Sequence, residues 1–232
     1  MMHRPHLTGK NRITEAFYNG PRFRKFVFWE NTFLLFVGGV RGARRRILRH
    51  LGDVENKDLL EVGIGDGANV HLLPRSTRIT GVDIAGSRLI ECRRRCEKAG
   101  RDISLVLAEG EHLPLADDSF DLSLSVGGLN HYSDPAAAIR EMSRVTRPGG
   151  RIVVADEIPN IVDYAWGHRI WCPKLDDWII RHWFGDEFHR MVMQCNTDPK
   201  SLANDCLSEG QVHRIWRGYG YCIVGRPTEN AS

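Results

Sequence analysis

The sequence lacks the patterns typical of metal-binding, disulfide-linked and membrane-spanning proteins. Its six cysteines form no CxxC pair and no HExxH motif is present, so we expect neither a metal site nor a disulfide framework. The longest apolar stretch, residues 26–40, contains Glu30 and is too short to cross the ~30 Å hydrocarbon core of a bilayer as a helix. No secretory signal peptide is recognisable, so we expect a protein of the reducing cytoplasm.

Internal repeats, low-complexity tracts and a second-domain linker are also missing. With 232 residues, 42% hydrophobic and 26% charged, the chain suits one large α/β domain. The net charge of +3 hides an asymmetry, because residues 1–50 carry 11 Lys and Arg against 2 Asp and Glu. This basic N-terminal segment favours an anionic partner such as a membrane surface, an acidic substrate or, less readily, nucleic acid. The alternative is that its basic residues form an ordinary solvated helix face.

The first fifty residues differ in pattern from the rest. Residues 1–20 are polar and we expect them to be loosely ordered. Residues 21–50 are expected to be helical, combining an apolar stretch with a basic run from Arg41 to Arg49. We interpret residues 1–50 as a basic and apolar helical cap segment, which either folds over an active site or lies peripherally on a membrane. Residues 51–232 would then form the main domain.

From Lys57 onward, short buried strands alternate with helices. The predicted strands are Asp58–Val62, Arg78–Asp83, Ile103–Leu107, Phe120–Val126 and Arg151–Ala155, the last entered through a turn at 148–150. The predicted helices are 67–73, 87–99 (with an Arg-rich outer face and packed Cys92 and Cys96) and 135–145. Strands separated by single helices predict a Rossmann-like, doubly wound, mostly parallel sheet with helices on both faces.

The last third has a different character. Residues 212–216 and 219–224 are strand-like around a turn at Arg217 and Gly218, which predicts a closing antiparallel hairpin. Residues 158–210 are rich in Trp and His, with a predicted helix over 175–193, and we interpret them as an insertion that shapes an acceptor pocket. Their aromatic residues either line that pocket or form a packed helix stripe: Trp166, Trp171, Trp178, Trp183, Phe184 and Phe188.

The strongest chemical signal is the glycine turn after the first strand, with Gly63, Gly65 and Gly67. Glycine permits positive φ and lets a ligand approach the backbone. The spacing satisfies the loose dinucleotide fingerprint, and Asp83 ends the next strand where an acidic residue binds ribose hydroxyls. NAD and S-adenosylmethionine both need that carboxylate. Glu61 favours S-adenosylmethionine, because a carboxylate attracts an ammonium or sulfonium group and repels a pyrophosphate.

Four sequence blocks resemble the class I S-adenosylmethionine-dependent methyltransferases, and within them the ubiquinone/menaquinone-biosynthesis C-methyltransferase group. The blocks are residues 59–67, 81–84, 109–121 and 144–150, with a further likeness over 128–134. The resemblance implies that the methionine part of the cofactor lies beside Glu61, Gly63, Gly65 and Gly67. It implies ribose on Asp83, adenine on Ile84, the adenine amino group at Glu109 beside Gly110, and the methyl group near Ser125 and Val126.

Methyl transfer needs mainly alignment in a dry cavity, since the sulfonium already activates the methyl carbon. A phenol, enol or ring-carbon acceptor also requires a base, for which His131 is the first candidate, with Asp156 and Glu157 second. We expect transfer to a small, apolar or aromatic acceptor such as a quinone or lipid precursor. The alternatives are methylation of RNA or another macromolecule, disfavoured because no Asn/Asp-Pro-Pro-Tyr/Phe motif follows residue 124, and a non-catalytic cofactor-binding module. The acceptor's identity and the oligomeric state stay open.

Overall fold

The computed structural model describes residues 9–20, 39–157, 198–218 and 220–228, together with Trp178, Arg181, His182 and Asp186. The expected helix over 175–193 and most of the aromatic insertion therefore lie outside the described residues, as does segment 21–38 of the expected cap. Among the described residues, no helix is long and apolar enough to cross a membrane. No group of three or more His, Cys, Asp or Glu side chains in the same part of the chain is placed to hold a metal ion.

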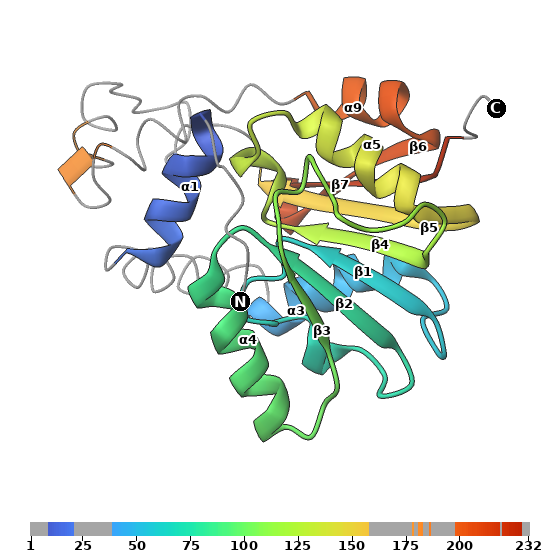
Figure 1. Cartoon of the computed structure of the whole chain (residues 1–232). Helices are drawn as coiled ribbons and strands as arrows, with labels where there is room; N and C mark the ends of the chain where they lie inside the picture. Colours follow the sequence, from blue (N-terminus) through green and yellow to red (C-terminus); the bar gives the residue numbers. More distant parts are fainter. Residues whose placement is uncertain are drawn as a thin grey trace.

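A seven-stranded sheet with the order β3-β2-β1-β4-β5-β7-β6 forms the centre of the protein (Figure 1). Its strands are β1 (Asp58–Val62), β2 (Arg78–Asp83), β3 (Ser104–Leu107), β4 (Phe120–Val126), β5 (Thr146–Glu157), β6 (Ser208–Ile215) and β7 (Gly220–Arg226). Strands β1 to β5 are parallel, and β7 runs antiparallel to both β5 and β6. The predicted Rossmann-like sheet with a closing hairpin is confirmed.

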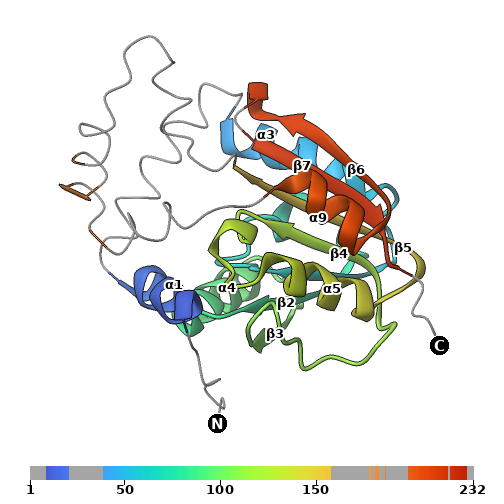
Figure 2. The same cartoon turned by 90° about the horizontal axis from the view of Figure 1, so that it is seen from above.

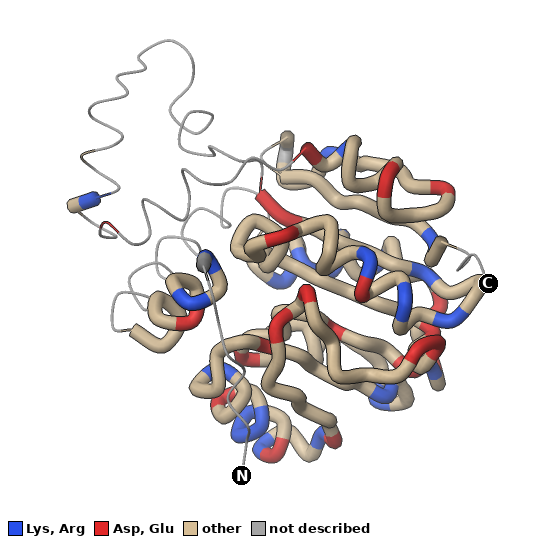
Figure 3. Tube along the Cα trace, turned by 45° about the horizontal axis from the view of Figure 1, so that its top comes forward, with Lys and Arg blue, Asp and Glu red and all other residues tan. Residues whose placement is uncertain are grey.

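Helices cover both faces of the sheet (Figures 1 and 2). One hydrophobic cluster joins α3 (Gly39–Leu48) and α4 (Gly86–Lys98) to the sheet, and a second joins α5 (Pro135–Val145) and α9 (Pro199–Cys206) to the opposite face. On α4, Cys92 and Cys96 are buried free thiols, while Arg93, Arg94 and Arg95 are exposed. Figure 3 shows in blue where Lys and Arg lie along the described chain. The predicted Arg-rich outer face of this helix is therefore confirmed.

Three local predictions were wrong. Residues 67–73 form turns and the short 3-10 helix η2 (Val70–Leu72) instead of an α-helix, because Gly67 at φ 77° and Pro74 leave too few residues to nucleate one. Strand β5 begins at Thr146, and the 148–150 segment lies within it as an irregularity beside Phe120 and Leu122 on β4. Residues 9–19 form helix α1 (Gly9–Asn19), which is ordered by contacts described below.

Candidate active site

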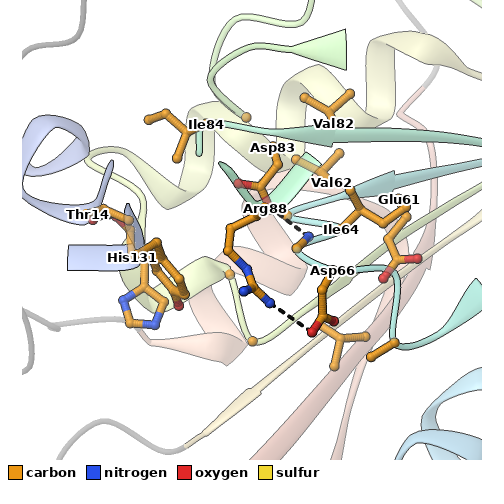
Figure 4. A pocket seen from close by; sticks show the side chains of 18 of the residues that line it. Thr14, Glu61, Val62, Ile64, Asp66, Val82, Asp83, Ile84, Arg88 and His131 are labelled. Carbon is orange, nitrogen blue, oxygen red and sulfur yellow. Dashed lines mark hydrogen bonds and ion pairs between the residues drawn. The ribbon is translucent and has the colours of Figure 1, made fainter. Parts of the chain in front are cut away.

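A cavity of about 350 Å³ opens at the carboxyl ends of the central strands (Figure 4). Its floor comes from the glycine turn after β1 and the loops after β2, β3 and β4, and its walls include residues of α1 and α3 together with Trp216. The chain order of the sheet reverses between β1 and β4, which is where ligands bind in open α/β sheets. The volume lies in the range of small-molecule and cofactor pockets.

The glycines of the turn have different roles. The backbone N–H groups of Gly63 and Ile64 donate to the carbonyl of Val82 at 2.8 and 3.1 Å, which ties the turn to β2. At Gly65, with φ 57°, no atom of the described residues lies within 4 Å of the position where a Cβ would stand, so this glycine leaves open space in the cavity wall. At Gly67 a Cβ would lie 2.7 Å from the Cys92 sulfur, and Gly67 does not belong to the described cavity lining. Gly67 therefore allows α4 to pack closely.

Asp83 anchors the turn from the end of β2. One carboxylate oxygen accepts from Gly65 N at 2.8 Å and the other accepts from Ala85 N at 2.8 Å. Burial raises the pKa of this carboxyl, although the two backbone donors oppose the shift. Each carboxylate oxygen can accept a second hydrogen bond, so Asp83 can hold ribose hydroxyls in the cavity while it fixes the turn. Ile84, the next residue, also lines the cavity.

Glu61 is a buried carboxylate at the cavity wall, with only 2% of its surface exposed. Its Oε1 accepts from Asn69 Nδ2 at 2.6 Å, and Arg44 Nη1 on α3 donates to Asn69 Oδ1 at 3.1 Å. Its Oε2 has no hydrogen-bond partner in the described part of the chain. Burial raises the pKa of Glu61 to about 7, against the opposing effect of Asn69 and Arg44. An unpaired, buried carboxylate oxygen fits the ammonium group of S-adenosylmethionine, which would supply the missing partner.

The two glutamates after β3 lie in different places. Glu109 is absent from the described cavity lining, and its Oε2 lies 3.5 Å from His112 Nδ1. Glu111 does line the cavity; its Oε1 accepts from Asn11 Nδ2 at 3.1 Å and from Ser133 N at 2.7 Å, while its buried Oε2 has no described partner. Sequence reasoning missed Glu111, whose only signal was its position in the 109–121 block.

Of the remaining predicted cofactor residues, two line the cavity and one lies behind the lining. Gly110 and Val126 line the cavity, and a Cβ at Gly110 would lie 3.1 Å from the Tyr132 ring. Ser125 is buried behind the described lining, where its hydroxyl lies 3.2 Å from the Tyr132 hydroxyl. Tyr132 itself lines the cavity, so Ser125 contacts a lining residue without belonging to the described lining.

His131 ends the 3-10 helix η3 (Leu129–His131) and lines the cavity. The Tyr18 ring of α1 meets its imidazole edge-on, with the ring centroids 5.6 Å apart. Burial, reinforced by Lys10, lowers the pKa of His131 to about 4, so the imidazole is neutral at pH 7. A neutral imidazole retains one nitrogen that can accept a hydrogen bond.

The two carboxylates at the end of β5 have separate environments. Asp156 is fully buried, and its oxygens accept from Asn130 N at 2.9 Å and Glu157 N at 2.8 Å. Burial raises the pKa of Asp156 to about 6. These bonds hold the loop after β4, which is a structural role, and Asp156 does not appear in the described lining. Glu157 does line the cavity.

Helix α1 contributes Asn11, Thr14 and Tyr18 to the cavity lining. Figure 4 shows Thr14 beside His131. Asn11 donates to Glu111, and its Oδ1 accepts from Ser133 N and Oγ at 3.1 and 3.0 Å. Thr14 donates to the His131 carbonyl at 3.1 Å. On the expected cap segment, Val40, Ala43 and Arg44 of α3 also line the cavity.

We expect Asn11→Ala to loosen α1 and to weaken binding of S-adenosylhomocysteine by about tenfold, because a buried donor and acceptor lose partners worth about 1–3 kcal/mol. Limited proteolysis of residues 1–20 and calorimetry measure the two effects. Asn19→Ala is the control, since Asn19 lies at the other end of α1 and its side chain hydrogen-bonds the exposed Ser87 hydroxyl. Equal effects of both substitutions would contradict a specific role for Asn11.

Comparison with known proteins identifies the family. The family described as "Methyltransferase domain" matches residues 60–154. A demethylmenaquinone methyltransferase of Tropheryma whipplei is 35% identical over 197 residues, covering 75% of this chain and 80% of that protein. Methyltransferase GfsG of Streptomyces halstedii is 39% identical over 102 residues, which span 42% of this chain and only 37% of that protein.

Solved structures support the fold. Geranyl diphosphate C-methyltransferase from Streptomyces coelicolor, solved with S-adenosyl-L-homocysteine, superposes with a TM-score of 0.58 at 15% identity over 80% of this chain and 78% of its own. Identity this low shows a shared fold only. The 35% identity over four fifths of the Tropheryma whipplei enzyme goes further: the chain belongs to the class I S-adenosylmethionine-dependent methyltransferases.

Proposed function

We propose that this chain transfers the methyl group of S-adenosylmethionine to an apolar aromatic acceptor of the quinol type, such as a demethylmenaquinol. The observation that carries the donor half of this proposal is the unpaired Oε2 of Glu61 in a cavity that also contains Asp83. The acceptor class is supported by the likeness to a demethylmenaquinone methyltransferase over most of the chain.

The cofactor would be held along the carboxyl ends of β1, β2 and β3. Glu61 would pair with its ammonium group, the backbone of Gly63 and Gly65 would lie along its methionine part, and Asp83 would accept from the ribose hydroxyls. Ile84 would pack on the adenine. We assign the adenine amino group to Glu111 beside Gly110, because Glu111 Oε2 is unpaired in the cavity and Glu109 lies outside its described lining. When bound, the cofactor supplies a methyl carbon activated by the sulfonium.

The chain's own residues supply alignment and exclude water. Helices α1 and α3 form walls of the cavity, and Val126 closes its floor at the end of β4. We propose that His131 accepts a hydrogen bond from the acceptor's hydroxyl and so raises the electron density of the ring. With a pKa of about 4, its imidazole is suited to accepting that hydrogen bond and poorly suited to retaining the proton at pH 7. The proton released on methylation then passes to solvent.

We further propose that the enzyme works in the cytoplasm at an anionic membrane surface, which would present a lipid-soluble acceptor. Helix α3 buries Ala43 and Ile47 while Arg41, Arg45 and Arg46 are exposed, so its inner face borders the cavity and its outer face is basic. Basic residues near such a surface contribute about 1 kcal/mol each. Segment 21–38 lies outside the described residues, and its membrane contact stays a prediction.

The proposal is tested by incubating the protein with methyl-labelled S-adenosylmethionine and one acceptor at a time. The acceptors are a dithionite-reduced 2-prenyl-1,4-naphthoquinone, a long-chain fatty acid and total RNA. We expect label in the organic phase with the quinol only. Label in the fatty acid or the RNA would replace the proposed acceptor class, and no calorimetric binding of S-adenosylhomocysteine would refute the donor assignment.

A further inference from the structure

Trp216 is a cavity-lining residue with an unexplained hydrogen-bond donor. It begins the 3-10 helix η4 (Trp216–Gly218) between β6 and β7, and only 8% of its surface is exposed. Its indole nitrogen is buried and has no hydrogen-bond partner in the described part of the chain. Buried indole N–H groups usually find an acceptor, since leaving one unpaired costs free energy. A ligand in the cavity is therefore the natural source of this acceptor.

The backbone at Trp216 gives a second, independent indication. Its φ is 51°, in the left-handed region that bulky side chains rarely adopt. Gly220 makes room for the indole, because a Cβ there would lie 2.5 Å from Trp216 Cε3. The hairpin thus holds a large aromatic residue in an unfavourable backbone conformation against a glycine. Strain maintained in this way is concentrated at binding sites.

The position of Trp216 separates it from the adenosine end of the cavity. Its ring lies against Gly220 of β7, which pairs with Glu157 at the end of β5. Asp83 and Ile84, the proposed adenosine contacts, lie on β2 and its following loop, on the other side of β1 in the sheet. The indole therefore lies on the β4–β5 side of the cavity, which the adenosine part leaves for the acceptor.

We propose that the indole N–H of Trp216 donates a hydrogen bond to a ring oxygen, hydroxyl or carbonyl, of the methyl acceptor. This inference rests on the proposed aromatic acceptor class. It makes Trp216 a residue that selects oxygen-bearing rings over unsubstituted ones of the same size. An oxygen of the cofactor's carboxylate has the same hydrogen-bonding chemistry, and the experiment separates the two sources.

The direct test is the indole ¹H–¹⁵N NMR signal of Trp216 in the full chain, assigned by its loss in Trp216→Phe. We expect the signal to stay in place on addition of S-adenosylhomocysteine and to move downfield when millimolar 1-naphthol is added to that complex. Naphthalene, which lacks the oxygen, is the matched probe and should cause no downfield shift. The signal lost in Trp178→Phe is the internal control, since Trp178 is 55% exposed and stacks on His182.

Kinetics supply a second readout. Trp216→Phe is expected to raise the KM for 2-prenyl-1,4-naphthoquinol by about tenfold, the loss typical of one hydrogen bond, with the KM for S-adenosylmethionine unchanged. An unchanged calorimetric affinity for S-adenosylhomocysteine shows that the variant is folded. A downfield shift of the Trp216 signal caused by S-adenosylhomocysteine alone would assign the indole to the cofactor and overturn the proposal. The absence of any shift with 1-naphthol would also overturn it. If 1-naphthol shifts the Trp216 signal downfield but the protein does not methylate the quinol, the role of Trp216 stands and the proposed reaction is refuted.

Discussion

Replacing Glu61 with glutamine is expected to weaken the binding of S-adenosylhomocysteine at pH 8 by about a hundredfold. The substitution keeps the acceptor for Asn69 Nδ2 and removes the negative charge beside the bound ammonium group. Hydrogen bonds to charged groups contribute about 1.5–3 kcal/mol, and about 2.7 kcal/mol corresponds to a hundredfold change. Isothermal titration calorimetry measures the change, and unchanged affinity would refute Glu61 as the ammonium partner.

The affinity of the unsubstituted protein should also depend on pH. Because the pKa of Glu61 is about 7 before ligand binds, part of the carboxyl is protonated near neutrality and cannot pair with an ammonium group. Affinity should therefore rise from pH 5 to pH 8, with proton release on binding, and should be nearly flat in Glu61→Gln. Glu91→Gln is a matched control, since Glu91 lies on α4 away from the cavity and pairs with Arg94.

Glu61→Gln should also stabilise the ligand-free protein at high pH. The pKa of Glu61 is raised in the folded state, so its contribution to stability is fully present below pH 4.5 and is lost as the pH rises through about 7. A shift from 4.5 to about 7 corresponds to about 3 kcal/mol. Urea unfolding should therefore show little gain for Glu61→Gln at pH 5 and a gain of about 1–3 kcal/mol at pH 8. Equal effects at both pH values would show that the ionised carboxylate is not the cause.

Alanine substitutions at Gly65 and Gly67 are expected to affect stability and cofactor binding in different proportions. Gly67→Ala places a Cβ 2.7 Å from the Cys92 sulfur at φ 77°, and should lower the free energy of unfolding by about 2–4 kcal/mol. Gly65→Ala, at φ 57° with open space around it, should cost about 1–2 kcal/mol. It should weaken S-adenosylhomocysteine binding far more than Gly67→Ala, because its methyl group occupies space at the cavity wall.

Thermal unfolding and calorimetry on both variants separate the two roles. Cys92→Ala combined with Gly67→Ala should recover part of the lost stability, because it removes the sulfur that the new methyl group approaches. Simple additivity of the two substitutions would argue against this contact. Lost binding with unchanged stability in Gly67→Ala would instead make Gly67 a cofactor contact, as the family resemblance implies.

The elements predicted correctly are those whose signals are local. Strands β1, β2 and β4 and helix α5 have the predicted bounds, because runs of buried residues end at turn residues and α5 begins at Pro135 after the capping Asp134. The segment 67–73 was wrong because its apolar pattern was too short to outweigh Gly67 and Pro74. Helix α1 was missed because its order comes from hydrogen bonds of Lys10, Asn11 and Thr14 to the loop after β4, more than a hundred residues away.

Sequence alone indicated the sheet, the glycine turn, the presence of Glu61 before that turn and of Asp83 after the next strand, and therefore the methyl donor, because each of these signals lies in a short stretch of the chain. The tertiary structure decided which side chains face the cavity. It placed Glu111 rather than Glu109 in the lining, assigned Gly67 to packing, and brought Arg44 and Trp216 to the same cavity from opposite ends of the domain. These outcomes depend on strand order and helix docking, which bring together residues far apart in sequence and leave no local pattern.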